Sequence, residues 1–447
     1  MREYIVKLTP VQLLVLIYFV AVSISSFLLY LPVAHKPGVE ITYLDALFTA
    51  VSAVSVTGLT VVSTADTFSP TGVAMLMVML QFGGIGFMTL GTFLWMATGQ
   101  RIGIARRRMI MLDQNQTNLS GLVRLMRDIL LISLAIEVIG ALILGTHFYL
   151  FYDYGWKAYL YGAFSSLSAF TNAGFDIFGN SLEGFARDYF VQTVNLILIV
   201  GGAIGFPVLV ELKEWFTTRK QKPFRFSLFT KLTVSVYFAL FALSMVTIAL
   251  LEFNQHYAGM AWHEALYYTL FNSITTRSAG LATMDMTDYS TPTQLFLSFM
   301  MFIGASPSSV GGGIRTTTFA VVALAIFFYA RGYNHIRIFR RELLTEDVRK
   351  ASIVFGVGVM IVATALIAVV WEQPEHDLMT IIFEVCSAFG TTGLSMGLTP
   401  ELTTPGKLTI LLLMFIGRIG ILSLLFLIRE DRPPAVYHYP REKVIIG

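Results

Sequence analysis

Four short glycine-bearing stretches recur along this chain at nearly even spacing, and they constrain its fold more than any other feature. Their glycines are Gly58, Gly174, Gly280 and Gly393, which are separated by 116, 106 and 113 residues. Each glycine follows a short apolar segment in a chain that is rich in apolar residues. A near-constant period of this kind indicates one structural unit that is used four times.

The composition predicts a membrane protein. Of the 447 residues, 55% are hydrophobic and only 13% are charged, which is far from an ordinary soluble domain. The runs 11–32 and 351–371 carry no charge, and each is long enough to cross about 30 Å of hydrocarbon. No small-residue cleavage signal follows the first run, so we expect a retained helix. The single cysteine, Cys386, excludes an internal disulfide.

The charge of the connections alternates along the chain. Basic residues cluster in 101–127, 213–231 and 331–350 and near both termini, whereas the intervening connections are acidic. Under the positive-inside rule, the basic connections and both termini lie in the cytoplasm. The sequence therefore predicts a multi-pass protein of the cell membrane, with an external face that weakly attracts cations.

Each quarter of the chain predicts the same unit: an outgoing apolar helix, a shorter apolar helix, a glycine loop and a long returning helix. The outgoing helices are expected at about 11–32, 124–151, 228–251 and 351–371. The short helices are expected at about 43–53, 158–170, 264–275 and 378–389. About eleven residues span only ~16 Å, so the short helices should enter from outside and stop near the midplane.

These units predict an all-α integral membrane fold with eight spanning helices and four re-entrant pore helices around a central pore. Non-helical backbone at membrane depth is tolerated only inside protein or against water, so the glycine loops should face one wet axis. The four pseudo-symmetric repeats are expected at 1–110, 111–222, 223–345 and 346–430, followed by a C-terminal tail at 431–447.

The returning helices share small-residue motifs at similar distances from the four glycines. The motifs are Gly83-Gly84-Ile85-Gly86, Gly202-Ala203-Ile204-Gly205, Gly304-Ala305-Ser306-Pro307 and Gly417-Arg418-Ile419-Gly420. Any single motif indicates close helix packing as readily as a special role. Their recurrence favours a shared role in widening or bending the inner pore.

The chemistry of this unit favours cations. The C-terminal end of each re-entrant helix carries roughly half a negative charge, and glycine lets the following loop turn its carbonyls toward the axis. Backbone oxygens that replace water favour an easily dehydrated ion such as K⁺. The residues expected to bind the ion are Val56, Thr57, Gly58, Asn172, Ala173, Gly174, Ser278, Ala279, Gly280, Thr391, Thr392 and Gly393.

With their flanking residues, these loops resemble the four filters of the Trk/Ktr/HKT superfamily of K⁺ transporters. The stretch 389–404 is especially similar to the Ktr-type membrane subunit, and the similarity runs nearly end to end. In relatives that favour Na⁺ the first filter glycine is commonly serine, so Gly58 implies K⁺ selectivity. The resemblance implies K⁺ uptake, with K⁺ as the transported ion, Na⁺ as a candidate activator and no organic cofactor in this chain.

The third returning segment cannot form a continuous apolar helix, because proline removes a backbone donor and glycine lowers helix propensity. Its irregular residues are Gly304, Ala305, Ser306, Pro307, Ser308, Ser309, Gly311, Gly312 and Gly313. The segment 304–313 resembles the intramembrane gating loop of Ktr-type subunits, although a static kink is the alternative. Arg418 lies in an apolar run, where a charge costs at least ~2.5 kcal/mol without partners. We expect it to bond carbonyls of this loop as an electrostatic barrier, rather than to extend to an interface.

Arg277 directly precedes the third glycine loop. A cation that faced the pore would block K⁺, so we expect Arg277 to point backwards and brace the filter by pairing with Glu384 or Asp45. Glu137 lies within an outgoing helix; we expect a buried partner and assign it no role. Arg315 is expected near the cytoplasmic mouth.

The resemblance also implies partners. These are a second copy of the chain, each copy with its own pore, and a cytoplasmic ring of nucleotide-binding RCK subunits docked on the basic connections. The tail residues 437–447 are expected to reach across the dimer interface. Membrane lipid is a further expected partner and nucleic acid is not, since no basic patch is interleaved with aromatic residues.

Two other classes of function stay open at this point. An intramembrane enzyme would need a nucleophile–base pair or metal ligands at membrane depth, and the sequence has no His-Glu-x-x-His motif. The closer alternative is a Na⁺-permeable or ungated cation channel of the same fold. Measurements of ion flux in K⁺ and in Na⁺ distinguish these functions.

Overall fold

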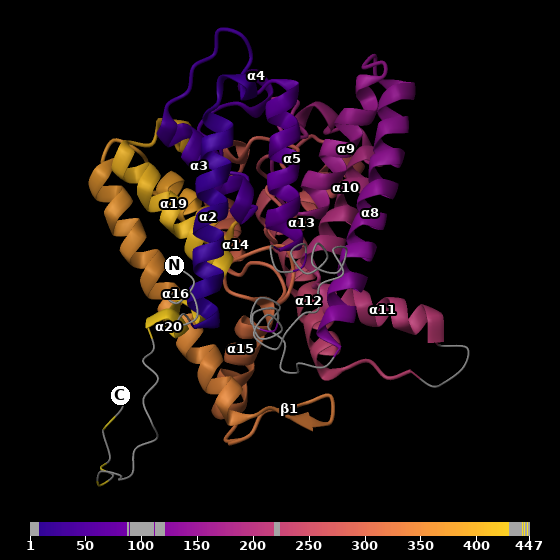
Figure 1. Ribbon diagram of the computed structural model, residues 1–447. Coiled ribbons are helices and arrows are strands. Elements are labelled where there is room, and N and C mark those ends of the chain that lie inside the picture. The colour runs from indigo at the N-terminus through magenta and orange to yellow at the C-terminus, as the bar shows by residue number, and fades with distance from the viewer. Residues whose placement is uncertain are drawn as a thin grey trace.

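The computed structural model describes residues 9–86, 121–218 and 224–428, together with the single residues 89, 111, 440, 442 and 445. In these ranges the regular secondary structure is almost entirely helical, as the sequence predicts, and its strands form one short hairpin. Long helices run roughly alongside one another, and shorter helices lie between them (Figure 1). The residues 87, 88, 90–110, 112–120, 219–223 and most of 429–447 lie outside the described part. The repeat boundaries therefore stay a prediction there, as do parts of the docking connections 101–127 and 213–231 and the role of the tail.

The outgoing helices form where the uncharged runs predict them. They are α2 (Pro10–Tyr30), α8 (Leu122–Phe151), α12 (Leu228–Glu252) and α16 (Thr345–Glu372). Among the described residues, these four helices are individually long and apolar enough to cross a bilayer. Helix α16 begins six residues earlier than predicted. Its first turn contains Glu346 and Asp347, and acidic side chains stabilise the positive end of a helix dipole.

The short helices also lie where they were predicted and have 13 or 14 residues each. They are α3 (Tyr43–Ser55), α9 (Lys157–Phe170), α13 (Trp262–Thr275) and α17 (Leu378–Gly390). A helix of this length is too short to cross the hydrocarbon region. Burial increases toward the C-terminal end of each of these pore helices, so each one points into the protein.

All four returning segments end or break within the described residues, whereas the sequence predicted a break only in the third. They are α5 (Pro70–Ile85), α10 and α11 (Tyr189–Ala203 and Phe206–Thr218), α14 and α15 (Thr291–Phe302 and Thr316–Ala330), and α19 and α20 (Thr404–Ile419 and Ile421–Ile428). The bends are 103° between α10 and α11 and 94° between α19 and α20. Figure 1 shows α11 lying across the direction of α8. Both bends fall at the small-residue motifs 202–205 and 417–420, for which the sequence favoured a role in widening or bending the inner pore.

Glycine explains these breaks. The last residue of three of the small-residue motifs has a positive φ: +93° at Gly86, +105° at Gly205 and +86° at Gly420. A left-handed or otherwise positive-φ residue ends a helix, and glycine adopts such conformations without the steric cost that a Cβ adds.

The earlier glycines of the motifs allow close packing. A Cβ on Gly83 would lie 2.6 Å from the carbonyl oxygen of Val54 at the end of α3. A Cβ on Gly202 or on Gly417 would overlap the carbonyl oxygen of Phe170 or of Phe389, respectively. The returning helices therefore lie directly against the C-terminal ends of the pore helices, and any larger residue would push the two apart.

The connections complete the fold. The short helices α4 (Thr64–Thr67) and α18 (Leu398–Glu401) and the 3₁₀ turns η1 (Pro32–Ala34), η2 (Glu183–Phe185) and η3 (Met286–Asp288) follow outgoing helices or glycine loops. Strands β1 (Arg337–Ile338) and β2 (Arg341–Glu342) form an antiparallel hairpin in which Arg337 pairs with Glu342. The hairpin and α4 lie at opposite ends of the molecule (Figure 1).

Candidate functional site

The four glycine loops, residues 56–58, 172–174, 278–280 and 391–393, meet in a closed ring. A Cβ on each glycine would contact the carbonyl oxygen of the residue that precedes the next glycine; for Gly58 and Ala173 this distance is 2.6 Å. The remaining contacts are Gly174 with Ala279, Gly280 with Thr392, and Gly393 with Thr57. Loops more than 100 residues apart in the sequence thus surround one point. Each loop contacts the loop of the next repeat, and the fourth contacts the first.

The loops share one backbone conformation. Each of the four glycines has a positive φ, between +69° and +94°. In every loop the residue two positions earlier is also left-handed: φ is 57° at Val56, 53° at Asn172, 76° at Ser278 and 46° at Thr391. Non-glycine residues seldom adopt this conformation. These four left-handed residues were not predicted from the sequence, but their recurrence shows that the loops follow the same path.

A hydroxyl group from the pore helix holds the glycine loop in the first and fourth repeats. Oγ of Ser52 accepts a hydrogen bond of 3.1 Å from the backbone N–H of Gly58. Oγ of Ser387 accepts one of 3.0 Å from the N–H of Gly393. Each N–H that is bound this way is directed away from the axis toward the supporting helix.

In the second and third repeats the corresponding hydroxyl donates instead. Oγ of Ser168 donates to the carbonyl oxygen of Phe175, and Oγ1 of Thr275 to that of Leu281, both at 2.6 Å. Our sequence reasoning missed these four supporting hydroxyls. A signal was present, since the stretches at 52, 168 and 387 all begin with a Ser-Ala pair.

The loop that interrupts the third returning segment, residues 303–315, lies in the protein interior. Residues 303–312 are all buried. The N–H of Val310 donates to the carbonyl oxygen of Gly202 at 3.3 Å, and the N–H of Gly313 donates to that of Gly417 at 3.2 Å. The carbonyl oxygen of Ser308 accepts from the N–H of Phe206 at 2.8 Å. The returning segments of the second and fourth repeats thus provide partners for this interrupting loop.

The interrupting loop also contacts the glycine loops directly. The N–H of Gly312 donates to Oγ of Ser278 at 3.2 Å. A Cβ on Gly311 would lie 2.6 Å from Cβ of Ser278, and one on Gly312 would lie 2.5 Å from Oγ1 of Thr391. Glycine at these two positions lets the interrupting loop approach the ring.

Two arginines bind carbonyl oxygens of the interrupting loop. Arg418 donates through Nη1 to Val310 and through Nη2 to Gly83 on α5. Arg315 donates through Nη1 to the carbonyl oxygen of Gly311. Arg418 therefore joins the interrupting loop to the end of the first returning helix. The bond to the interrupting loop was predicted from the sequence, and the bond to Gly83 was not.

Arg277 is fully buried, but its partners differ from those expected. Its guanidinium donates to the carbonyl oxygens of Met300 at 3.3 Å and Ile303 at 3.1 Å, and to Oγ of Ser244 at 3.0 Å. The expected pairing with Glu384 or Asp45 is wrong. Because α14 ends at Phe302, its last carbonyls have no helical partner, and they accept from the guanidinium in place of a carboxylate.

Glu384 and Asp45 have other partners. Oε1 of Glu384 accepts hydrogen bonds from Oγ of Ser395 and from the N–H of Thr399 at 3.2 Å, which ties the chain after the fourth glycine loop to α17. Oδ1 of Asp45 accepts from Nζ of Lys407 at 2.8 Å, which joins α3 to α19. Both carboxylates thus connect pore helices to neighbouring segments.

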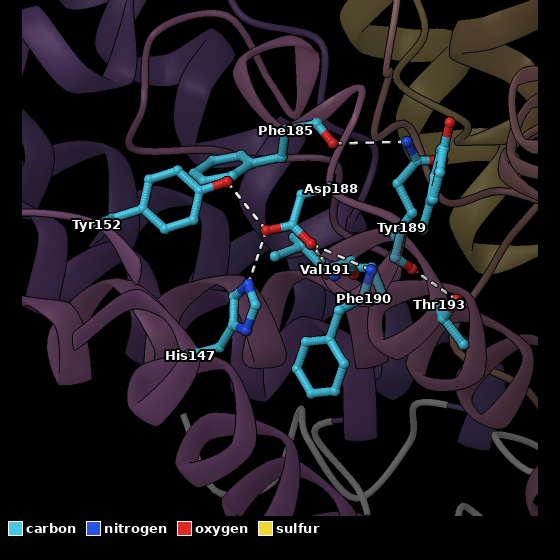
Figure 2. Close-up of polar contacts among 10 residues, drawn as sticks. His147, Tyr152, Phe185, Asp188, Tyr189, Phe190, Val191 and Thr193 are labelled. Atoms are coloured by element: carbon cyan, nitrogen blue, oxygen red, sulfur yellow. Dashed lines mark hydrogen bonds and ion pairs between the residues drawn. The ribbon is translucent and has the colours of Figure 1, made fainter. Parts of the chain in front are cut away.

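A polar cluster fixes the end of the second repeat at which α8 meets α10. Asp188 precedes α10, and Oδ1 of its carboxylate accepts from the N–H groups of Phe190 and Val191 at 3.1 Å. Figure 2 shows His147 and Tyr152 directed at the same carboxylate, with distances to Oδ2 of 2.7 Å from Nε2 and 3.0 Å from the phenol oxygen. Burial opposes ionisation of Asp188, but these hydrogen bonds outweigh it and lower its pKa. The cluster attaches the start of α10 to the end of α8.

The described part of the chain contains no group of three or more His, Cys, Asp or Glu side chains placed to hold a metal ion. The polar groups around the ring are backbone carbonyls and hydroxyls. Such groups suit a weakly held, dehydrated monovalent cation.

Comparison with known proteins identifies the family. Residues 9–436 match the family described as TrkH, cation transport protein. The chain is 53% identical over 446 residues to Ktr system potassium uptake protein D of Bacillus subtilis (strain 168), covering 100% of this chain and 99% of that protein. It is 33% identical to the potassium/sodium uptake protein NtpJ of Enterococcus hirae, covering 99% and 98% of the two chains.

A solved structure has the same fold. The crystal structure of the potassium transporter TrkH from Vibrio parahaemolyticus matches with a TM-score of 0.72 at 19% identity, over 93% of this chain and 83% of that one. The fold and the family matches define a membrane transporter of cations and not an enzyme. The chain belongs to the TrkH family of cation transport proteins, as a Ktr-type membrane subunit.

Proposed function

We propose that this chain takes up K⁺ across the cell membrane through the ring formed by the four glycine loops. The convergence of these loops on one point, each glycine against the next loop, carries the proposal. The carbonyls and hydroxyls of 56–58, 172–174, 278–280 and 391–393 replace the water around K⁺. The pore helices α3, α9, α13 and α17 end beside the ring, and the negative ends of their dipoles favour a cation there.

The interrupting loop is the proposed gate. It lies against the ring through Gly311 and Gly312, and its backbone is held by the second and fourth returning segments. Arg418 adds a positive charge that hydrogen-bonds to this loop. In the closed state the loop and the guanidinium obstruct the path, and opening requires both to move. Arg277 braces the third glycine loop against the end of α14, and Glu384 and Asp45 hold neighbouring segments.

The assembly is a homodimer in a lipid membrane, with a cytoplasmic ring of RCK-type subunits controlling the gate. The basic hairpin between 331 and 350 lies at the end opposite α4, which supports a cytoplasmic location for this end and for both termini under the positive-inside rule. Family membership and the similarity to a Ktr protein support this proposal.

Uptake of ⁸⁶Rb⁺ and ²²Na⁺ into proteoliposomes tests the proposal. The purified chain should carry Rb⁺, as a substitute for K⁺, at least about tenfold faster than Na⁺, which corresponds to ~1.4 kcal/mol of discrimination. No uptake above that of empty vesicles, either alone or with the cytoplasmic partner, would contradict it. Equal rates for the two ions would favour the second candidate, a Na⁺-permeable channel. This candidate is kept because the relative from Enterococcus hirae is named a potassium/sodium uptake protein.

A further inference from the structure

A group of positive side chains that takes no part in the site above gathers where the first turns of α8 meet α11. Arg124, Arg127 and Lys213 have side-chain nitrogens 3.8, 3.6 and 3.2 Å from carboxylate oxygens of Asp128. The Asp128 side chain is 13% exposed, whereas the three basic side chains are 77%, 54% and 44% exposed. Three positive charges and one negative charge leave this basic cluster with a net charge of +2, open to its surroundings.

The two arginines continue the apolar face of α8. They are followed, at alternating steps of four and three residues, by three exposed apolar residues of the same face: Leu131, Leu134 and Val138. The buried side of α8 instead carries Glu137, whose carboxylate accepts a hydrogen bond of 2.9 Å from Gln81 on α5. Because α8 can cross a bilayer, the exposed face meets hydrocarbon. Arg127 lies about 6 Å beyond Leu131 along the helix axis, so both arginines face lipid headgroups sideways.

Helix α11 brings the lysine to the same level. It bends by 103° from α10 and lies across the direction of α8 (Figure 1). Its exposed apolar residues Leu212 and Phe216 are one turn apart and share a face, and Lys213 lies between them in the sequence. An in-plane helix that exposes apolar side chains beside a lysine is typical of a helix that rests in the membrane interface.

We propose that Arg124, Arg127 and Lys213 bind the phosphate of an anionic phospholipid in the cytoplasmic leaflet, with its acyl chains against Leu131 and Leu134. A guanidinium offers paired N–H donors that match phosphate oxygens. The net charge of the basic cluster favours a headgroup whose phosphate charge is not cancelled. A zwitterionic lipid carries its own ammonium, which the basic cluster would repel. A protein that docks from the cytoplasm would meet the helix ends instead of this lateral face.

The basic cluster is connected to the proposed gate. Helix α11 begins at Phe206, whose N–H donates to the carbonyl oxygen of Ser308 in the interrupting loop at 2.8 Å. A lipid that binds Lys213 therefore restrains the same helix that holds this loop, and it stabilises the loop in the position described above. This regulatory consequence, and the choice of leaflet, rest on the proposed function; the binding itself does not.

Native mass spectrometry of the purified full-length chain in a neutral detergent tests the binding, because the micelle then has no surface charge of its own. Phosphatidylglycerol and phosphatidylcholine with the same acyl chains are titrated separately. We expect phosphatidylglycerol to bind at least about tenfold more tightly. The double variant Arg124→Gln/Arg127→Gln should lose this preference. It keeps Lys213 as the partner of Asp128, so the carboxylate is not left buried without a positive charge.

A matched double variant separates a binding site from a general attraction of charges. Arg340→Gln/Arg341→Gln removes the same number of positive charges from exposed residues of the hairpin and should keep the wild-type preference. Ammonium phosphate at the same ionic strength should not displace the lipid. Displacement by phosphate would show that any phosphate anion fills the site and would overturn the assignment to lipid.

The remaining results also decide the proposal. Equal affinities of the wild type for the two lipids would overturn it, as would an equal loss of preference in both double variants. A preference that survives in Arg124→Gln/Arg127→Gln would overturn it too, and loss of binding to the RCK-type ring in that variant would assign the arginines to the protein partner. If this variant does not fold, Arg124→Gln alone and the wild-type comparison still decide. A preference that depends on these arginines in protein that fails to take up Rb⁺ would sustain the lipid site and reject the proposed transport function.

Discussion

The hydroxyl oxygen of Ser278, in the third glycine loop, accepts a hydrogen bond of 3.2 Å from the backbone N–H of Gly312 in the interrupting loop. The same oxygen lies 2.7 Å from the carbonyl oxygen of Gly390 and 2.8 Å from that of Thr391, to which it donates. One side chain thus joins the third and fourth repeats of the ring to the proposed gate. Movement of the interrupting loop away from the ring must break this contact.

Replacing Ser278 by alanine is expected to destabilise the closed state. The substitution leaves the buried N–H of Gly312 without its acceptor, at a cost of about 1–3 kcal/mol. If most of that cost falls on the closed state, Rb⁺ uptake in the absence of the cytoplasmic partner should rise about tenfold. Proteoliposome uptake measures this. Ser298→Ala is the control, because Ser298 is a buried serine of α14 whose hydroxyl donates to the carbonyl oxygen of Gln294 at 2.8 Å. An unchanged or lower rate in folded Ser278→Ala protein would show that the contact does not hold the gate.

Removing the Arg418 side chain is also expected to increase flux. Arg418→Ala loses the hydrogen bonds to Val310 and Gly83 and removes a positive charge from the proposed ion path. Arg418→Lys should show a smaller increase, because an ammonium keeps the charge but cannot reproduce the forked contacts. Single-channel or flux recordings compare these variants with Arg187→Ala, whose parent side chain is 84% exposed and forms an ion pair of 3.4 Å with Glu264. Wild-type flux in Arg418→Ala would exclude the barrier.

A matched pair of substitutions separates two effects of replacing glycine: crowding of the neighbouring loop in the ring, and backbone strain alone. Gly58 has a φ of +94° and its Cβ would crowd the carbonyl oxygen of Ala173, whereas Gly38 has a φ of +83° and nothing within 4 Å. Gly58→Ala should therefore lower the ratio of K⁺ to Na⁺ flux by about tenfold. Gly38→Ala carries only the backbone strain of about 1–3 kcal/mol and should keep the ratio. Equal ratios in Gly58→Ala and the wild type would refute a selective role for the ring.

Acid should weaken the contact between α8 and α10. The pKa of Asp188 is lower in the folded than in the unfolded chain, so its carboxylate stabilises the fold above the unfolded pKa of about 4, and this contribution disappears as the pH falls through the folded pKa. Asp188→Ala also loses a helix cap worth about 0.5–2 kcal/mol. The melting temperature of the wild type should exceed that of Asp188→Ala at neutral pH, and the difference should shrink below about pH 4. A difference that stays unchanged from neutral pH down to the acid limit of the folded protein would assign the effect to packing.

The repeat, the outgoing helices and the pore helices could be predicted because apolar length and evenly spaced glycines are properties of local sequence. The recurring small-residue motifs indicated a bend in the returning helices, but they did not predict that α10 and α19 stop before Gly205 and Gly420, since the apolar runs continue past these glycines and only the backbone reveals their positive φ. The carboxylate partners proposed for Arg277 failed for a related reason. The prediction paired Arg277 with residues of opposite charge. The actual acceptors are the last backbone carbonyls of α14, which lack a helical partner because that helix stops at Phe302.

Three of the four supporting hydroxyls could have been predicted by comparing the repeats with one another. Ser52, Ser168 and Ser387 precede their glycines by six residues each. Ser52 and Ser387 bond the N–H of their glycines, and Ser168 bonds the carbonyl oxygen of Phe175, directly after its glycine. Aligning the repeats on the glycines would have found them. The third repeat uses Thr275, which is displaced by one residue, so only the structure shows that the same function is present in all four.

The most direct test locates the ion. Crystals of the full-length protein grown with Rb⁺ or Tl⁺ in place of K⁺ should show an anomalous peak on the axis between the four glycine loops. The carbonyl oxygens of the residues that precede Gly58, Gly174, Gly280 and Gly393 should surround this peak. Exchange into Na⁺ should remove it. Well-ordered glycine loops with no peak between them, in crystals where Rb⁺ or Tl⁺ is seen elsewhere along a membrane path, would contradict the central claim that these loops select K⁺.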